Sequence, residues 1–349
     1  MLTYISAFFV SLLLTYLLTP MVKKIAFRMD ALDMPGERRI NKKAIPTMGG
    51  IAIYLGFLIP VLLLTNMTST MLGIILGGSF ILIVGILDDL YELSPGLKLS
   101  GQIAAASILI LFGVRVEFIT NPFGGMIYLG TWGIPLTLLW VVSITNTVNL
   151  VDGLDGLAAG ISVIAALTLF FVGLQEGQFT AAIMAIALAG SSLGFLKYNF
   201  NPADIFMGDT GAMFLGFILA AISVSGALKS AAAVTLIVPV LALGVPIFDT
   251  IFAIIRRLYN KKPIGEADHG HLHHRLLALG LNQRQAVLSV YGISLGLGLM
   301  ALIINGSNFQ DAVIILISVV LLLVYGAWKV GIFSVELPTE STSLENSNL

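Results

Sequence analysis

The sequence contains no cysteine, and only 11% of its 349 residues are Asp, Glu, Lys or Arg. The absence of cysteine excludes disulfide bonds and thiol catalysis, although it identifies no cellular compartment. The scarcity of charge, together with 57% hydrophobic residues and a mean hydropathy of +0.98, excludes an ordinary soluble globular domain. The chain is therefore predicted to be a membrane protein.

Apolar runs that could cross about 30 Å of hydrocarbon recur from end to end. They predict an all-α polytopic membrane protein of about 10–11 transmembrane helices, forming a single domain over residues 1–335. A tail over 336–349, rich in Ser, Thr, Asn and Glu, is predicted to be disordered. The expected spans are 2–22, 48–65, 70–87, 99–112, 132–148, 155–174, 179–196, 209–227, 233–255, 285–304 and 311–329.

Threading these spans alternately across a membrane places 16 of the 18 basic residues on one face, and only Arg115 and Lys229 on the other. Since basic residues collect on the cytosolic face, we expect the N-terminus outside and the C-terminus in the cytosol. The same threading brings six aspartates and all four histidines to the cytosolic face. These are Asp88, Asp89, Asp152, Asp155, Asp204, Asp209, His269, His271, His273 and His274.

Two features interrupt the helical pattern. Residues 114–119 and 126–129 flank an Asn-Pro-Phe-Gly-Gly stretch, which predicts a small β-hairpin on the outer surface. Pro239 and Pro246 lie within the ninth span, which we expect to be kinked or broken there.

Asp88 and Asp89 follow an apolar run. They could simply end a helix in the headgroup region, where a charge costs far less than the roughly 3 kcal/mol expected at mid-bilayer. Two adjacent carboxylates at a helix C-terminus nevertheless oppose the helix dipole and repel each other. We therefore expect a compensating cation, either a bound metal or Lys98.

Asp152 and Asp155 belong to the polar stretch 146–160. Asp-Gly is a common turn dipeptide, so a turn is one interpretation. The Asp-x-x-Asp spacing would instead place both acids on one helical face, where Gly153 allows a ligand to approach closely. A calcium loop fits less well, because the alternating ligands that it requires are missing.

Two further polar motifs follow. Asp209 opens the eighth span, where it could be an N-cap or a magnesium ligand. The run from Asp268 to Arg275 carries the histidines, for which zinc binding and a solvated loop are alternatives to phosphate binding. Asp249, seven residues before Arg256, is expected to orient that arginine.

Together these motifs resemble the polyprenyl-phosphate N-acetylhexosamine-1-phosphate transferase family. The resemblance covers residues 30–280 and rests on four motifs in a fixed order. They are Asp88-Asp89, Asn149-Leu-Val-Asp-Gly-Leu-Asp-Gly-Leu-Ala, Phe206-Met-Gly-Asp-Thr-Gly and His271-Leu-His-His. The His-x-His-His form is similar to bacterial members that start teichoic acid, O-antigen or enterobacterial common antigen synthesis. The sister enzyme for phospho-N-acetylmuramoyl-pentapeptide usually has three consecutive histidines.

The resemblance implies a role for each matching residue. Asn149 and Asp209 would hold Mg²⁺, or Mn²⁺, on the diphosphate, while Lys98, Asp88 and Asp89 would face the lipid phosphate. The uridine would contact Gly153, Asp155, Asn199 and Phe206, with the phenyl ring stacked on the base, and Asp152 would be a further substrate-binding residue. Sugar and phosphate would lie against His271, His273, His274 and Arg275.

The resemblance also implies the reaction, in which GlcNAc-1-phosphate passes from UDP-GlcNAc to undecaprenyl phosphate in the bacterial plasma membrane. Asp88 or Asp89 could act as a base, or one aspartate could form a covalent intermediate. Because a phosphate monoester is largely dianionic near pH 7, its second pKa being about 6, direct attack is favoured.

Other functions remain open at this point. The sister pentapeptide transferase is the alternative within the family, and a cation-coupled transporter or a non-enzymatic lipid-binding scaffold are alternatives outside it. The expected partners are the bilayer and the two substrates, with a homodimer left open and no nucleic acid. Glu117, Glu176 and Asp311 are the only acids threaded to the outer face, which argues against an ion path.

Overall fold

The computed structural model describes residues 1–34, 43–120, 126–227, 237–259, 261 and 270–331. The tail 336–349, the basic residues Arg38, Arg39, Lys42, Lys229 and Lys262, and the motif residues Asp268 and His269 lie outside these ranges. The described part contains thirteen α-helices and two small β-hairpins. The helices are α1 Leu2–Arg28, α2 Gly50–Leu64, α3 Ser69–Tyr91, α4 Pro95–Leu111, α5 Gly133–Val151, α6 Leu157–Gln175, α7 Phe179–Asn199, α8 Gly208–Ala227, α9 Ile237–Ala242, α10 Gly244–Tyr259, α11 Leu272–Ala278, α12 Gln283–Asn305 and α13 Phe309–Lys329.

Each predicted span coincides with a helix, so the all-α polytopic prediction is confirmed. Eight helices in the described residues are long and apolar enough to cross a membrane. The second and fourth spans are the shorter helices α2 and α4. The ninth is broken into α9 and α10 between Pro239 and Pro246, as the prolines predicted, although residues 233–236 lie outside the described part. The protein is a multi-pass membrane protein.

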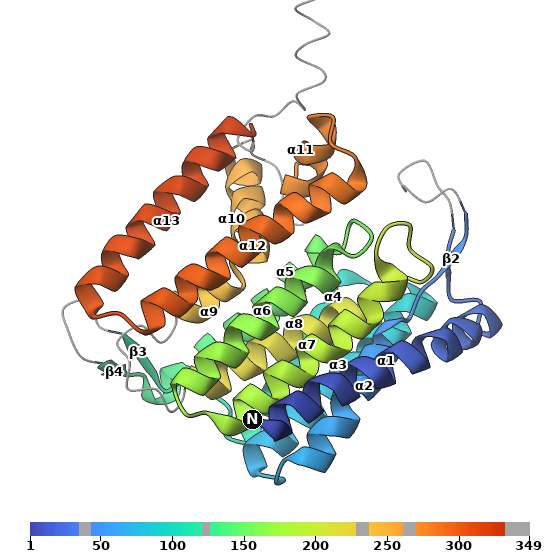
Figure 1. Ribbon diagram of the computed structural model, residues 1–349, viewed down its shortest axis with the longest axis horizontal. Coiled ribbons are helices and arrows are strands. Elements are labelled where there is room, and N and C mark those ends of the chain that lie inside the picture. Colours follow the sequence, from blue (N-terminus) through green and yellow to red (C-terminus); the bar gives the residue numbers. More distant parts are fainter. Residues whose placement is uncertain (35–42, 121–125, 228–236, 260, 262–269, 332–349) are drawn as a thin grey trace, which may run out of the picture.

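Helix α8 is the centre of the bundle, because 83% of its apolar window is buried, against 17% for α13. It packs against α2, α3, α5, α6 and α7 (Figure 1). Phe214 of α8 meets Tyr54 and Phe57 of α2 edge to face, at centroid distances of 5.4 and 5.7 Å. Helices α9 to α13 form a second group on one side, where α12 packs against α6 and α9 (Figure 1).

The two hairpins lie at opposite ends of the bundle (Figure 1). Strands β3 (Phe118–Thr120) and β4 (Met126–Tyr128) pair antiparallel, which confirms the predicted hairpin, although its turn at 121–125 is outside the described residues. Strands β1 (Leu32–Asp33) and β2 (Ile45–Pro46) pair next to the C-terminal end of α1. We call the end with β1 and β2 the site end, because the polar motifs gather there.

Small residues let the helices approach closely at the site end. A Cβ on Gly85 of α3 would lie 2.5 Å from the Cα of Thr210 on α8. A Cβ on Gly50 of α2 would lie 2.2 Å from the backbone nitrogen of Gly211. Backbones that touch in this way exclude any side chain from the contact. The N-terminus of α8 is thereby held between α2 and α3.

The contact between α3 and α8 predicts the effect of a single methyl group. Gly85→Ala would force the two helices apart and should reduce the free energy of unfolding by about 1–3 kcal/mol. The melting temperature of the detergent-purified protein measures this loss. Gly292→Ala in α12 is the control, because no atom lies within 4 Å of a Cβ there. Equal melting temperatures for the two variants would contradict the close contact.

Candidate active site

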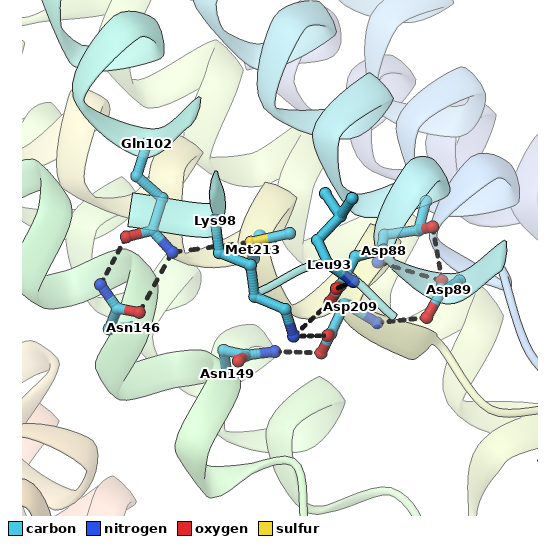
Figure 2. Close-up of polar contacts among 10 residues, drawn as sticks. Asp88, Asp89, Leu93, Lys98, Gln102, Asn146, Asn149, Asp209 and Met213 are labelled. Carbon is cyan, nitrogen blue, oxygen red and sulfur yellow. Dashed lines mark hydrogen bonds and ion pairs between the residues drawn. The ribbon is translucent and has the colours of Figure 1, made fainter. Parts of the chain in front are cut away.

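Four helix ends meet at the site end and bring three polar side chains into contact. Asp209, in the first turn of α8, places one oxygen 2.7 Å from Lys98 Nζ at the start of α4. Its other oxygen accepts a hydrogen bond of 2.6 Å from Asn149 Nδ2 near the end of α5. Figure 2 shows this arrangement, with Asp209 between the lysine and the amide. Residues up to 111 positions apart therefore form one cluster.

The adjacent acids at the end of α3 point to different partners. Asp88 is 4% exposed, forms an ion pair with Lys98, and accepts a 2.8 Å hydrogen bond from the backbone nitrogen of Leu93. This confirms that Lys98 can supply the expected compensating cation. Asp89 faces α8, where its carboxylate accepts from the backbone nitrogens of Asp209 (2.9 Å) and Thr210 (3.2 Å) and from Thr210 Oγ1 (2.6 Å).

Asp89 thus caps a helix other than its own. The first amides of a helix have no partner within it and carry a partial positive charge, which a carboxylate satisfies and neutralises. The alternative in which Asp209 caps α8 is wrong, because Asp209 lies inside the first turn and Asp89 accepts from its amide. Gly208 has φ +69°, and a Cβ there would lie 2.2 Å from Asp89 Oδ2. Only glycine fits that position.

The turn between α5 and α6 holds the Asp-x-x-Asp motif. Asp152 and Asp155 do not share a helical face, because residues 152–156 are non-helical; the turn interpretation is correct. Asp155 Oδ2 accepts from Asn201 Nδ2 and from the backbone nitrogen of Ala203, each at 3.0 Å. Burial, followed by the negative charges of Asp209, Asp89 and Asp155, raises the pKa of the Asp152 carboxyl to about 8.

Asn199 is the last residue of α7, and Phe206 lies in the segment that joins α7 to α8. Asn199 is 2% exposed. Its side-chain oxygen accepts a hydrogen bond from the backbone nitrogen of Gly156 at 3.1 Å, and its Nδ2 donates to the carbonyl of Ile205 at 3.0 Å. It therefore holds the α5–α6 turn against the α7–α8 segment. Phe206 is half-buried, and its backbone pairs with Pro46 and Gly49 at 2.8 and 3.0 Å. Their predicted contacts with uridine remain predictions.

The histidine motif is organised by Asp249 of α10. One oxygen of Asp249 lies 2.8 Å from His271 Nδ1, and the other accepts from the backbone nitrogen of Leu272 at 2.8 Å. The carboxylate of Asp249 thus begins α11 and orients His271, and the expectation that it orients Arg256 stays a prediction. A carboxylate on one ring nitrogen fixes the tautomer and leaves the other nitrogen for a ligand.

The rings of the histidine motif lie together and touch the Asp152 turn. The rings of His271 and His273 are parallel at 5.9 Å, and His274 lies 4.1 Å from His273. A Cβ on Gly153 would lie 2.6 Å from His273 Nε2, which has no hydrogen-bond partner in the described part. Burial, followed by the neighbouring His274, lowers the pKa of His273 to about 3. Arg275 is 1% exposed, and its Nε approaches the carbonyl of Gly270 at 3.4 Å.

The cluster has the donors for a hard cation but not a complete protein cage. Carboxylate and amide oxygens such as those of Asp209 and Asn149 are the ligands that Mg²⁺ uses, together with substrate phosphates. Within the described ranges, no group of three or more His, Asp or Glu residues is placed to hold a metal. A metal between Asp209 and Asn149 would therefore need oxygens from a substrate.

Sequence reasoning missed several residues that hold the site together. Thr210, Asn201 and Tyr291 bind the backbone or the carboxylates described above; the Tyr291 hydroxyl donates to the carbonyl of Gly156 at 2.5 Å. Gln102 and Asn146 form a buried pair next to the cluster. An amide within an otherwise apolar span, as at Gln102, is a signal that could have been used.

Fold and site together define a multi-pass membrane protein with a polar, acidic site at one end of its helical bundle. Residues 71–227 match glycosyl transferase family 4. The chain is 44% identical to the probable undecaprenyl-phosphate N-acetylglucosaminyl 1-phosphate transferase of Bacillus subtilis over 88% of this chain and 87% of that protein.

Two more distant relatives give the same result. Identity is 38% to the decaprenyl-phosphate N-acetylglucosaminephosphotransferase of Mycobacterium leprae, over 80% of this chain and 78% of that protein. Identity is 32% to the phospho-N-acetylmuramoyl-pentapeptide-transferase of Prochlorococcus marinus, over 86% of this chain and 89% of that protein. The chain belongs to the polyprenyl-phosphate N-acetylhexosamine-1-phosphate transferase family and is a sugar-phosphate transferase.

The contact between Asp249 and His271 predicts a loss of activity without a loss of fold. In Asp249→Asn one carboxylate oxygen becomes an NH₂ group, which cannot accept from both His271 and Leu272. Transferase activity should fall at least about tenfold, the usual scale for removing a partner that orients a ligating histidine. Initial rates and melting temperatures of the purified variant check this.

Asp204→Asn is the matched control, because Asp204 is 65% exposed and pairs only with Lys23 at 3.1 Å among the contacts described. Surface pairs of this kind contribute about 0–1 kcal/mol. Equal rates for the Asp249 and Asp204 variants would show that His271 needs no carboxylate.

Proposed function

We propose that the chain transfers GlcNAc-1-phosphate from UDP-GlcNAc to undecaprenyl phosphate, giving undecaprenyl-diphospho-GlcNAc and UMP. The observation that carries this proposal is the cluster of Asp209, Lys98 and Asn149 beside Asp88, at the meeting of four helix ends. The 44% identity over most of both chains supports this donor and acceptor. Such a product would be the first lipid-linked intermediate of a cell-wall polymer.

The site end is proposed to face the cytosol. A UDP-sugar is charged and does not cross a bilayer, so its site must open on the side where it is made. The threading that gathers 16 of 18 basic residues on one face supports this orientation. The lipid phosphate would then reach the cluster from the inner leaflet.

A divalent cation, Mg²⁺ or Mn²⁺, is proposed to bind between the protein and the donor diphosphate. Asp209 would hold it together with the amide oxygen of Asn149, once that amide, which donates through Nδ2 to Asp209 at 2.6 Å, turns its oxygen toward the cation. The acidic character of the cluster supports this, because Asp88 and Asp209 both pair with the ammonium of Lys98, and the carboxylate of Asp89 accepts from the backbone nitrogen of Asp209. When bound, the cation neutralises phosphate charge and makes the phosphorus more electrophilic.

The reaction is proposed to be a direct displacement. An oxygen of the lipid phosphate attacks the sugar-linked phosphorus, and the bond from that phosphorus to the bridging oxygen breaks, so that the oxygen leaves with UMP. The anomeric bond survives with its configuration. Lys98 offsets the repulsion between the two phosphates, and Asp88 holds Lys98 in position. Asp89 already accepts three hydrogen bonds from α8, which favours a positioning role over a covalent one.

The remaining motif residues are proposed to bind the donor. Gly153, Asp155, Asn199 and Phe206 would form the uridine side, in part by shaping the turn that Asn199 holds. His271, His273, His274 and Arg275 would contact sugar and phosphate. A phosphate beside His273 would favour its charged form and satisfy Nε2, which lacks a partner among the described residues.

The experiment that tests the function measures UMP release by the purified protein with undecaprenyl phosphate, Mg²⁺ and a panel of UDP-sugars. UDP-GlcNAc should be the productive donor, and omission of the lipid phosphate should abolish release. Release only with the UDP-muramoyl-pentapeptide donor would move the chain to the sister activity. No release with any sugar would refute the proposal.

Asp209→Asn should reduce UMP release by at least about 10²-fold, because the variant loses a charged ligand and the partner of Lys98. Mg²⁺ with UDP-GlcNAc should raise the melting temperature of the unaltered protein, but not that of the variant. Full activity of Asp209→Asn at ordinary Mg²⁺ concentrations would remove Asp209 from the metal site.

A further inference from the structure

A second tier of polar side chains lies one turn below the Lys98 cluster. Gln102 of α4 donates to Asn146 Oδ1 of α5 at 3.1 Å, and Asn146 Nδ2 donates to Gln102 Oε1 at 2.5 Å (Figure 2). Gln102 Nε2 also approaches Met213 Sδ of α8 at 3.6 Å, and Asn146 donates to the carbonyl of Val142 at 2.9 Å. Nothing assigned above to substrate or metal involves this pair.

The second tier is in register with the first on all three helices. Gln102 follows Lys98 by four residues, Asn146 precedes Asn149 by three, and Met213 follows Asp209 by four. Residues three or four apart lie on the same face of a helix, about one turn from each other. The amide pair therefore joins the same faces of α4 and α5 that carry Lys98 and Asn149 at the site end.

Burial makes a hydrogen-bond partner for Gln102 obligatory. Gln102 is 2% exposed and lies within a helical bundle that spans a membrane, where an amide without a partner is costly. Two apolar side chains would pack there without that cost. A reciprocal amide pair differs from apolar packing in that its two hydrogen bonds fix both the distance and the rotation of α4 relative to α5.

We propose that Gln102 and Asn146 form a clamp that positions Lys98 and Asn149 around Asp209. The clamp holds α4 and α5 at the separation that allows the ammonium and the amide to reach opposite oxygens of one carboxylate. Both are positioning residues for the transfer reaction, so the inference rests on the proposed function. Neither side chain contacts the charged cluster directly in the bonds described.

The test compares the single variants Gln102→Leu and Asn146→Leu with the double Leu variant and with the swapped pair Gln102→Asn/Asn146→Gln. Gln102→Leu leaves the half-buried Asn146 with only the Val142 carbonyl, and Asn146→Leu leaves the buried Gln102 amide with only Met213 Sδ nearby. Each single variant should therefore lower both the melting temperature and kcat. The double Leu variant should regain the melting temperature, because no amide is left unpaired. Its kcat should remain at least about tenfold low, because the reacting groups are no longer held in register.

The swapped pair keeps both amides and the total side-chain length, so its kcat should return to within about threefold of the original. KM for the donor should change less than kcat in every variant, because the clamp positions reacting groups and does not bind the nucleotide. Thr145→Val is the control: Thr145 is buried on the same helix and bonds only the Val141 carbonyl of its own helix, at 2.7 Å. It should change neither quantity.

A double Leu variant with the original kcat would overturn the clamp, since apolar packing would then suffice. A folded swapped pair as slow as the single variants would also overturn it. If the double Leu variant does not fold, the swapped pair decides between these outcomes. All rates are taken relative to UMP release by the unaltered protein. If the unaltered protein releases no UMP, the proposed function is refuted. The melting temperatures of the single, double and swapped variants then still test whether the two amides pair.

Discussion

The hydrogen bonds from the start of α8 to Asp89 are the interaction on which the rest of the site depends. Amides at the start of a helix near hydrocarbon need an acceptor, and α8 receives one from α3. Gly85 and Gly208 leave room for this approach. Because the first turn of α8 is fixed in this way, Asp209 points toward α4 and α5, where Lys98 and Asn149 meet it.

The same contact explains how two adjacent acids are tolerated at the end of α3. Asp88 is neutralised by an ammonium and Asp89 by the partial positive charge of a helix N-terminus, so the two carboxylates diverge. Negative charge still exceeds positive charge locally, and this excess contributes to the raised pKa of Asp152. Two anionic substrates would not enter such a site alone, whereas a divalent cation bound to the diphosphate reverses the balance.

The sequence was sufficient for the spans, the hairpin of β3 and β4 and the broken ninth span, because hydropathy and proline act locally. It also predicted a cation for Asp88 and Asp89, either a bound metal or Lys98, and the structure pairs Lys98 with Asp88. It did not find the partners of Asp89 and Asp249, because each caps a different helix whose approach depends on tertiary packing. The turn at 152–156 was left between two interpretations for the same reason: Asn199 and Asn201, distant in sequence, hold it.

That turn also joins the two halves of the molecule. Gly153 lies against His273, the carbonyl of Gly156 accepts from Tyr291 of α12, and Asn201 links Asp155 to Gln283 at the start of α12. The group of α9 to α13 is therefore connected to the α1–α8 bundle at the turn that carries Asp152 and Asp155, in addition to the packing of α12 against α6. A ligand with a diphosphate at the cluster and a sugar at the histidines would contact both groups across this turn. Under the proposed function, the position of the turn would determine how the two ends of the donor face the acceptor, so the α5–α6 connection would serve binding as well as linking two helices.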